Sequence, residues 1–242
     1  MTSSISDQKT SSDRAEQLFY QGIEEMNSGR LQEAETALAE SLQLEPAHCS
    51  TAFNLAICHV RQGNYTCALE LFERTIELDP TLSTAYFYAG KTAALMNNYE
   101  DAITYFDRSL NSELPELPVR IARALALQAH GRMADAVADF TFVLEQEDNV
   151  AYRINRATCL MGMHDFNRAL EDIDTLHKDG EVSVETLVIQ FLSLKHLDCN
   201  HEALQVFEQL QQLDPDRGEQ LQASLAEELE EARSAINTIA KG

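Results

Sequence analysis

Two short stretches of the chain place arginine at matching positions. VRIARA (119–124) and YRINRA (152–157) lie 33 residues apart and share Arg, Ile, Arg and Ala in the same order. Guanidinium groups bind carboxylates and phosphates through two parallel hydrogen bonds. These residues are therefore a candidate anchor for an anion on a binding partner: Arg120, Arg123, Arg153 and Arg156. The alternative, which we favour, is that the chain neutralises them with carboxylates of its own, namely Asp135, Asp139, Asp172 and Asp174.

A second cluster carries atom types that could bind a metal. His196, Cys199 and His201 are close in sequence, but they span a predicted turn with Asp198 at its corner, so we interpret them as turn residues. The sequence contains no phosphate-binding loop, nucleophile elbow or metal-binding helix motif. The five cysteines are odd in number and lack the spacing of a metal or redox motif, so we expect reduced thiols. We therefore predict no catalytic residue, no metal and no cofactor.

The composition limits the classes of partner. The chain has 242 residues, of which 40 are Asp or Glu and 18 are Lys or Arg, giving a formal net charge of -22. This charge repels phosphate backbones and anionic lipid headgroups, so we expect no nucleic-acid or membrane partner. No apolar run approaches the roughly 20 residues that span a bilayer, and the start lacks the apolar core of a signal peptide. We therefore expect a cytoplasmic protein whose partner is another protein with an apolar or basic segment.

The arginine pairs belong to a longer repeat. An alanine recurs at steps of 34, 34, 34, 33 and 34 residues, each followed four residues later by an apolar side chain, at Ala34, Ala68, Ala102, Ala136, Ala169 and Ala203. Twelve positions before each alanine stands a second small residue, except for Phe191 in the last repeat: Gly22, Ala56, Gly90, Ala124 and Ala157. Small residues at both positions allow two helices to approach closely. Each repeat is therefore predicted to be a pair of packed helices.

A tight turn is predicted between the two helices of each repeat. Its corner residue is of a type that tolerates a left-handed backbone, at Gly29, Gly63, Asn97, Gly131, His164 and Asp198. All five prolines fall between one repeat and the next, where a helix must stop. Each repeat is therefore predicted to contain two antiparallel helices of about 14 residues, with no strand in the chain.

This pattern resembles the tetratricopeptide repeat family over residues 15–217. The best matches are AFNLAICHVRQGNYTCALELFERTIELDP and AYFYAGKTAALMNNYEDAITYF. The resemblance implies an all-α fold, a right-handed α-solenoid of stacked antiparallel helix pairs. Six units would begin near residues 15, 49, 83, 117, 150 and 184. The Ser- and Thr-rich residues 1–12 are expected to form a disordered N-terminal tail.

Residues 218–240 are predicted to form one further amphipathic helix. Apolar side chains recur at steps of 4, 4, 3, 4 and 3 with acids opposite, at Leu221, Leu225, Leu229, Ala232, Ile236 and Ile239. The end of a stacked array exposes an apolar face, so we interpret this segment as a capping helix that covers it. The same spacing also fits a two-heptad seam, which would join two copies of the chain as a homodimer or bind a partner.

The resemblance also implies a concave groove lined by the first helix of each unit, with ligand contacts at its second, fifth, ninth and twelfth positions. The fifth positions are apolar in all six units: Phe19, Phe53, Phe87, Ile121, Ile154 and Val188. The predicted binding residues at the ninth positions are Ile23, Ile57, Lys91, Leu125 and Leu192. An apolar stripe of this size on a monomer predicts a partner that covers it. The alternative is that these side chains pack between adjacent first helices as core.

We therefore predict a non-enzymatic interaction protein, an adaptor or chaperone. It would bind an apolar peptide, or one face of an amphipathic helix, of a partner protein in its groove. Two alternatives stay open. One is a structural scaffold that assembles a complex through its convex acidic surface or its C-terminal helix. The other is a peptide-sensing regulator, or a non-catalytic subunit of an enzyme.

Overall fold

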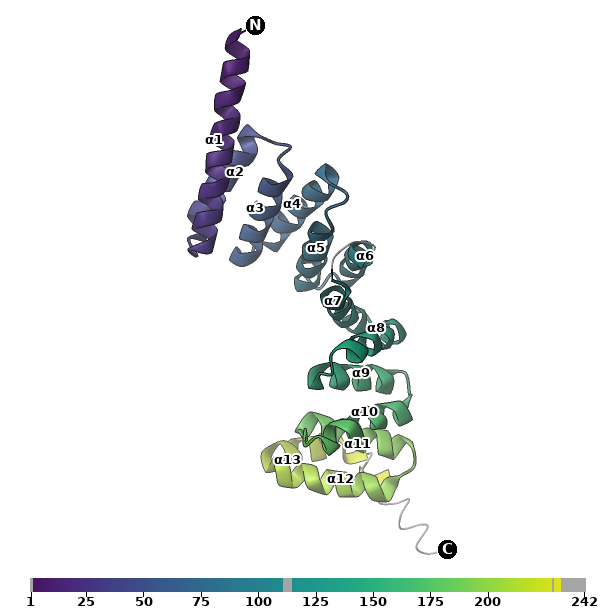
Figure 1. Ribbon diagram of the computed structural model, residues 1–242. Coiled ribbons are helices and arrows are strands. Elements are labelled where there is room, and N and C mark those ends of the chain that lie inside the picture. Colours follow the sequence, from purple (N-terminus) through teal and green to yellow (C-terminus); the bar gives the residue numbers. More distant parts are fainter. Residues whose placement is uncertain (1, 111–114, 228, 232–242) are drawn as a thin grey trace, which may run out of the picture. The chain divides into compact units, whose positions relative to one another are not determined.

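The computed structural model describes residues 2–110, 115–227 and 229–231. These residues form helices joined by short turns and contain no strand (Figure 1). The chain divides into two compact units, Met1–His130 and Gly131–Gly242, which we call unit 1 and unit 2. The division falls in the turn of the fourth predicted helix pair. The all-α fold of consecutive helix pairs predicted from the sequence is confirmed.

Within each unit, every helix contacts the helices that precede and follow it in the chain. Unit 1 contains α1 (Thr2–Asn27), α2 (Leu31–Leu44), α3 (Cys49–Gln62), α4 (Tyr65–Leu78), α5 (Ser83–Leu95), α6 (Tyr99–Leu110) and α7 (Glu116–Ala129). Unit 2 contains α8 (Met133–Gln146), α9 (Val150–Gly162), α10 (Phe166–Lys178), α11 (Val184–His196), α12 (Asn200–Leu213) and α13 (Pro215–Ser224).

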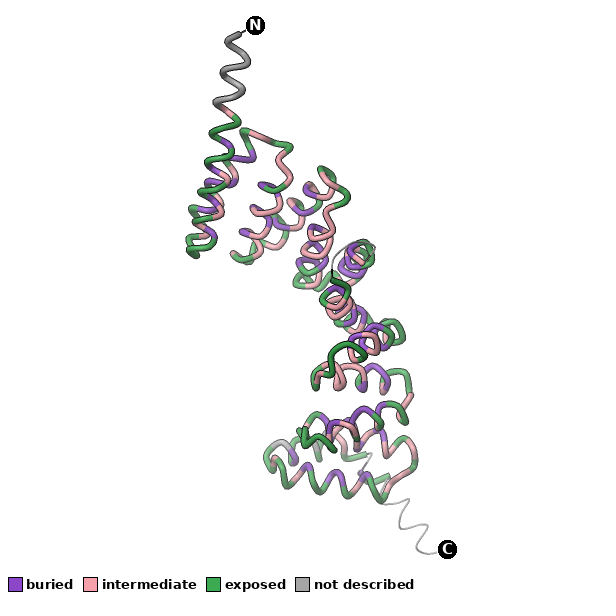
Figure 2. The backbone as a smooth tube through the Cα atoms, in the orientation of Figure 1, coloured by how far each residue is buried: buried purple, intermediate pink, exposed green. Residues whose placement is uncertain are grey.

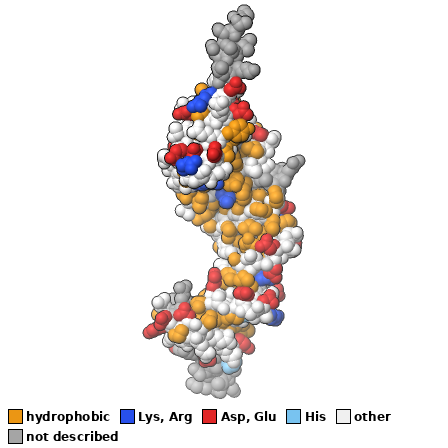
Figure 3. All heavy atoms as spheres, turned by 60° about the vertical axis from the view of Figure 1, so that its left-hand side comes forward, with side chains coloured by type: hydrophobic (Ala, Val, Ile, Leu, Met, Phe, Trp, Pro, Cys, Tyr) orange, Lys and Arg blue, Asp and Glu red, His pale blue; other side chains and the backbone are white. Residues whose placement is uncertain are grey.

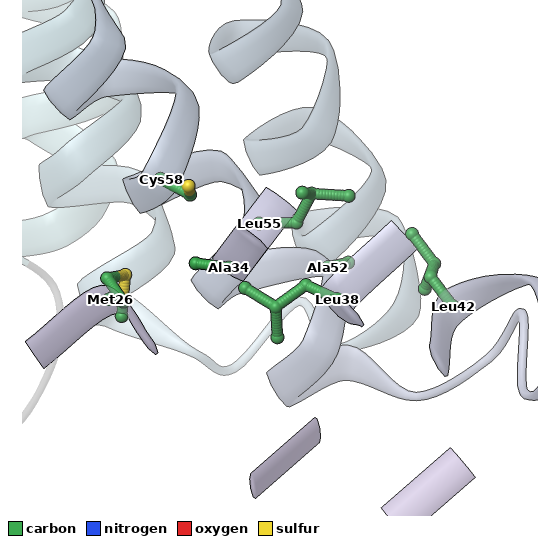
Figure 4. Close-up of a cluster of buried hydrophobic side chains, with 7 residues drawn as sticks. All are labelled: Met26, Ala34, Leu38, Leu42, Ala52, Leu55 and Cys58. Atoms are coloured by element: carbon green, nitrogen blue, oxygen red, sulfur yellow. The ribbon is translucent and has the colours of Figure 1, made fainter. Parts of the chain in front are cut away.

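Small residues bring the two helices of a pair together, as predicted. A Cβ atom added to Gly22 of α1 would lie 2.5 Å from Cγ of Leu38, which is fully buried in α2. A Cβ atom added to Gly90 of α5 would lie 2.7 Å from Cε1 of Phe106 in α6. Contacts this short leave no room for a methyl group. Figure 4 shows the core that forms around the first of these contacts, made by Met26, Ala34, Leu38, Leu42, Ala52, Leu55 and Cys58.

The predicted corner residues all have a left-handed backbone. The backbone angle φ of the glycines is 77° at Gly29, 82° at Gly63 and 84° at Gly131. At the other three corners φ is 59° at Asn97, 59° at Asp198 and 60° at His164. After α3 the amide of Gly63 donates to the carbonyl of Val60 at 3.1 Å. The next amide, of Asn64, donates to the carbonyl of His59 at 2.9 Å. These two bonds satisfy the last carbonyls of the helix and allow the chain to reverse direction.

Two buried hydroxyls each tie the end of a second helix to the first helix of the same pair. The hydroxyl of Ser41 in α2 donates to the carbonyl of Ala15 in α1 at 2.8 Å. In the third helix pair, the hydroxyl of Ser109 in α6 donates to the carbonyl of Ser83 in α5 at 3.3 Å. Both serines are buried, so these bonds compensate for the removal of the hydroxyls from water.

The start of the chain differs from the expected disordered tail over residues 1–12, because α1 begins at Thr2. No proline or glycine stands before Gly22. Nothing in the sequence therefore stops a helix that propagates from the packed part of α1 towards the N-terminus. Ser and Thr favour a helix less than alanine does, but the difference is below about 1 kcal/mol per residue.

The C-terminal segment differs from the single helix expected over residues 218–240. α13 ends at Ser224, Leu225 lies in a turn, and residues 226, 227 and 229–231 are again helical. This break allows Leu225 and Leu229 to contact the apolar core of the sixth helix pair, where Leu229 is buried. Phe191, the bulky exception to the small-residue pattern, lies in the same core with its ring centroid 5.7 Å from that of Phe207. The remaining residues of the expected helix, 232–240, lie outside the described residues.

Candidate protein-binding surface

The predicted binding residues of unit 1 lie on four first helices, α1, α3, α5 and α7. α1 contacts α3, and α5 contacts α7. Phe53 of α3 and Tyr88 of α5 join the remaining two helices, with ring centroids 5.6 Å apart. Hydrophobic side chains gather in Figure 3 over the part of unit 1 that runs from α3 to α7. We call the following residues the first-helix surface: Phe19, Ile23, Phe53, Ile57, Phe87, Lys91, Ile121 and Leu125.

Most of the first-helix surface is half-buried. Phe19, Ile23 and Ile57 pack with their inner atoms against the core shown in Figure 4, yet each keeps part of its side chain accessible. Leu125 is the most open apolar member, with 45% of its surface exposed. Figure 2 shows the same intermediate exposure along much of α3 and α5. These side chains therefore contribute to the core, as the second sequence-based alternative states, and keep part of their surface accessible.

Two tyrosines widen the aromatic part of the surface. Tyr20 follows Phe19 with ring centroids 5.4 Å apart, and it is 62% exposed. Tyr88 follows Phe87 with ring centroids 5.6 Å apart. Neither tyrosine was among the predicted binding residues. An aromatic side chain directly after the aromatic fifth position is the sequence signal that could have identified them.

Lys91 places a positive charge within this apolar surface. Its Nζ atom lies 5.5 Å from the ring centroid of Phe87 and 5.7 Å from that of Tyr88. An ammonium group at this distance is attracted by the electron-rich faces of the rings. Lys91 is exposed, so the rings position its charge where a carboxylate on a partner could reach it.

A pocket of about 340 Å³ lies at the α1 end of the first-helix surface. Its walls come from α1, the end of α2 and the start of α3, and they include Ser12, Glu16, Phe19, Tyr20, Glu45 and His48. The hydroxyl of Ser12 donates to Oε1 of Glu45 at 2.5 Å. The rings of Phe19 and His48 meet edge to face, with centroids 5.4 Å apart. Phe19 is the member of this pocket that the sequence analysis predicted.

Unit 2 carries a smaller set of predicted binding residues. Ile154 lies on α9, and Val188 and Leu192 lie on α11, which contacts α9. All three are half-buried. Val188 and Leu192 pack against the core of the sixth helix pair. The ninth position of α9 is the exposed Thr158, so the apolar stripe is narrower here than in unit 1.

The arginines of α9 are paired with carboxylates of the same unit. Arg156 binds Asp172 of α10 bidentately, at 2.9 Å from Nε and 2.5 Å from Nη2, and Asp172 is buried. Arg153 binds Asp148 at 2.7 Å and lies 3.5 Å from Asp172. The hydrogen bond from Arg153 lowers the pKa of Asp148 below its ordinary value. Asp172 is one of the four carboxylates expected from the sequence to neutralise these arginines.

The arginines of α7 have partners within unit 1. Arg120 binds Glu116, one helical turn earlier, at 2.5 Å. Arg123 binds Asp107 of α6 at 2.6 Å. Each of the four arginines is therefore paired with a carboxylate of the chain, which occupies donors that an external anion would need. Glu116, Asp107 and Asp148 were not among the carboxylates named from the sequence, and Asp135 pairs with Arg132 instead.

The cluster around the α11–α12 turn makes ordinary contacts. The ring of His196 stacks on Phe166 at 4.6 Å, and His201 lies 3.2 Å from the amide of Gln205. Cys199 donates weakly to a backbone carbonyl at 3.7 Å. Across the part of the chain that the structure describes, no group of three or more His, Cys, Asp or Glu residues could hold a metal ion. In the same residues, no helix combines the length and apolar character that crossing a membrane requires.

Comparison with known sequences gives a match to a family model and a match to a curated protein. Residues 27–109 match the family model of subunit 3 of the anaphase-promoting complex, or cyclosome. The chain is also 27% identical, over 177 residues, to a protein SGT1 homolog of Oryza sativa subsp. japonica. That match covers 63% of this chain and 46% of the relative, so the chain spans less than half the length of the curated protein.

Solved structures share the fold at low sequence identity. YrrB, described as a TPR protein with an unusual peptide-binding site, matches with a TM-score of 0.68 and 16% identity, over 78% of this chain and 97% of YrrB. PilF of Pseudomonas aeruginosa matches with a TM-score of 0.62 and 16% identity, over 89% of this chain and 99% of PilF. At such identities the likeness concerns the arrangement of helices. It agrees with the repeat pattern, the left-handed corners and the close helix pairs described above.

Proposed function

We propose that the first-helix surface of this chain, which shares the fold of tetratricopeptide repeat proteins, binds an apolar segment of another protein. The segment would be an extended peptide or the apolar face of an amphipathic helix, and the protein would act as an adaptor or chaperone. One observation carries this proposal. Apolar side chains on four successive first helices remain partly accessible, although those of α1 and α3 also touch the core.

The chemistry of the surface supports this kind of ligand. Aromatic side chains give large contact areas at a low cost in conformational entropy, and they dominate the energetics of many interfaces. Phe19, Phe53 and Phe87 repeat at the same position of successive helices, so an elongated ligand can contact them in turn. The peptide-binding site named for YrrB, which shares the fold, also supports a peptide ligand. The net charge of -22 favours a neutral or basic partner over an acidic one.

A displayed library of random peptides tests the proposal without knowledge of the natural partner. Three steps of roughly 10 Å between neighbouring first helices correspond to about ten extended residues. Peptides of roughly 16 residues would therefore reach from α1 to α7. We expect the full chain to enrich peptides rich in apolar residues, with the periodicity of a strand or of a helix. Fluorescence anisotropy then gives the Kd of each enriched peptide.

Leu125→Gln is the discriminating variant, because Leu125 is 45% exposed on α7 and its replacement should cost little stability. Leu78→Gln is the matched control, because Leu78 is 38% exposed at the end of α4, a second helix. We expect Leu125→Gln to weaken peptide binding about tenfold, which corresponds to about 1.4 kcal/mol, and Leu78→Gln to leave it unchanged. If no peptide is enriched, or if both variants bind like the original chain, the proposed function is wrong.

A further inference from the structure

The pocket at the α1 end of the first-helix surface differs chemically from the rest of that surface. Its volume of about 340 Å³ lies at the lower end of the range for ligand sites. Phe19 and Tyr20 provide aromatic walls, and Glu16 and Glu45 provide carboxylates. Figure 3 shows acidic side chains beside hydrophobic ones near the α1 end of unit 1. Walls of these two kinds suit a ligand group with an apolar stem and a cationic head.

The carboxylate of Glu45 is positioned by the chain and can still accept a further bond. The hydroxyl of Ser12 donates to Oε1 of Glu45, which leaves Oε2 for another donor. Nδ1 of His48 accepts the amide N–H of Thr51 as the cap of α3. No lysine or arginine is among the described residues that line the pocket. The field in the pocket is therefore negative.

The aromatic wall is open to a ligand. Tyr20 is 62% exposed, and its ring meets Phe19 at an interplanar angle of 65°. A lysine or arginine head over such a ring gains a cation–π attraction, and its methylene stem can pack along the ring edges. The protein makes the same kind of contact internally, where Lys91 lies over Phe87 and Tyr88.

From these contacts we propose that the pocket binds a lysine or arginine side chain of the partner segment. This proposal rests on the proposed function and adds a position and a charge to the ligand. The basic residue lies at the end of the segment that contacts α1 and α3, and the apolar residues continue towards α7. An acidic side chain would be repelled by Glu16 and Glu45. An apolar side chain would remove Glu45 from water without replacing its hydrogen bonds, which is unfavourable.

The peptides enriched from the display library carry the test. We expect them to contain Lys or Arg at one end of the apolar stretch. Replacing that residue by norleucine, which keeps an apolar stem and removes the charge, should weaken binding about tenfold at low salt. Added salt should reduce this difference, because the ion pair lies near the surface.

Glu45→Gln tests the protein side of the same contact. The amide oxygen can still accept from Ser12, so the variant keeps the shape of the pocket and loses its charge. We expect it to weaken binding by a factor similar to that of norleucine, and the two changes together should cost little more than either alone. Glu40→Gln, an exposed site on α2 outside the pocket, is the control of equal charge and should bind like the original chain.

The outcomes separate this proposal from the proposed function. Peptides that lack a basic residue but still lose affinity with Leu125→Gln would refute the pocket assignment and leave the first-helix surface as a binding site. Norleucine peptides that bind as tightly as their lysine parents would do the same, as would equal affinities of Glu45→Gln and Glu40→Gln. A library with no enriched peptide would contradict both proposals.

Discussion

Replacing Gly90 by alanine should destabilise the protein, even though alanine favours helices. The added Cβ atom would lie 2.7, 2.8 and 3.1 Å from Cε1, Cδ1 and Cζ of Phe106. Phe106 is 1% exposed, and its ring centroid lies 6.1 Å from that of Phe87. The ring therefore has no space into which it can turn. The new methyl group must push α5 and α6 apart or displace the buried ring.

Two opposing terms set the size of the effect. Replacing glycine by alanine inside a helix gains about 1 kcal/mol from the lower entropy cost of folding. Inserting a methyl group into a well-packed core costs about 1–3 kcal/mol. The difference is a net loss of about 1 kcal/mol, which lowers Tm by about 2–4 °C for a chain of this size.

Gly162→Ala is the matched control for this substitution. Gly162 is the last residue of α9, and a Cβ atom there would lie 3.6 Å from Cγ of Met133, an ordinary contact. Without a steric conflict the helix propensity acts alone, so stability should stay level or rise by up to about 1 kcal/mol. Thermal and urea unfolding, followed by far-UV circular dichroism, measure both variants.

The two variants should thus change stability in opposite directions. If Gly90→Ala stabilises the chain as much as Gly162→Ala, the small residues do not set the distance between paired helices, and the reasoning is refuted. Adding Phe106→Leu gives a second check, because a smaller partner leaves room for the methyl group. Gly90→Ala should then cost less in the Phe106→Leu background than in the original chain.

Two further predictions concern buried polar groups of unit 2. Asp172→Asn removes the carboxylate that Arg156 binds bidentately. Since the arginine side chain is 18% exposed, we expect the free energy of unfolding, measured in urea, to fall by about 2 kcal/mol, which is below the range for a fully buried pair. Asp135→Asn, at an exposed ion pair, should cost less than about 1 kcal/mol, and equal losses would contradict this assignment. His177 lies 2.9 Å from the hydroxyl of Thr186, and burial lowers its pKa below the ordinary value of 6.5. The unfolded chain then binds the proton more readily than the folded chain, so the contribution of neutral His177 to stability is complete above about pH 6.5 and is lost below it. The fall in Tm from about pH 7.5 to about pH 5.5 should therefore be smaller for His177→Gln than for the original chain. An equal fall in both would refute the explanation.

The helix pairs and their turns could be predicted from the sequence because they depend on local rules. A corner that needs positive φ restricts the residue type at one position, whatever the rest of the chain does. Asn97, His164 and Asp198 accordingly have φ near 60°, as their residue types indicated. The close approach at Gly22 and Gly90 follows from the absence of a side chain, which the sequence states directly.

The polar contacts could not be predicted in the same way. Arg153 has carboxylates both near in sequence and across the helix pair, and only its rotamer decides that Asp148 is the main partner. The pocket depends on residues from three elements, with Glu45 contributed by the end of α2. No periodic pattern marks Glu45. The break at Leu225 was also missed, because amphipathic spacing is the same for one long helix and for two helices joined by a turn.

The order of helix contacts has a consequence for how the protein forms. Within each unit the helices contact their neighbours in the chain or the next helix but one, as α1 contacts both α2 and α3. Such short sequence separations place the protein at the low end of contact order, where the entropy cost of closing loops is small and folding is fast. Neighbouring helix pairs can therefore pack on one another as their residues leave the ribosome, before the rest of the chain is synthesised.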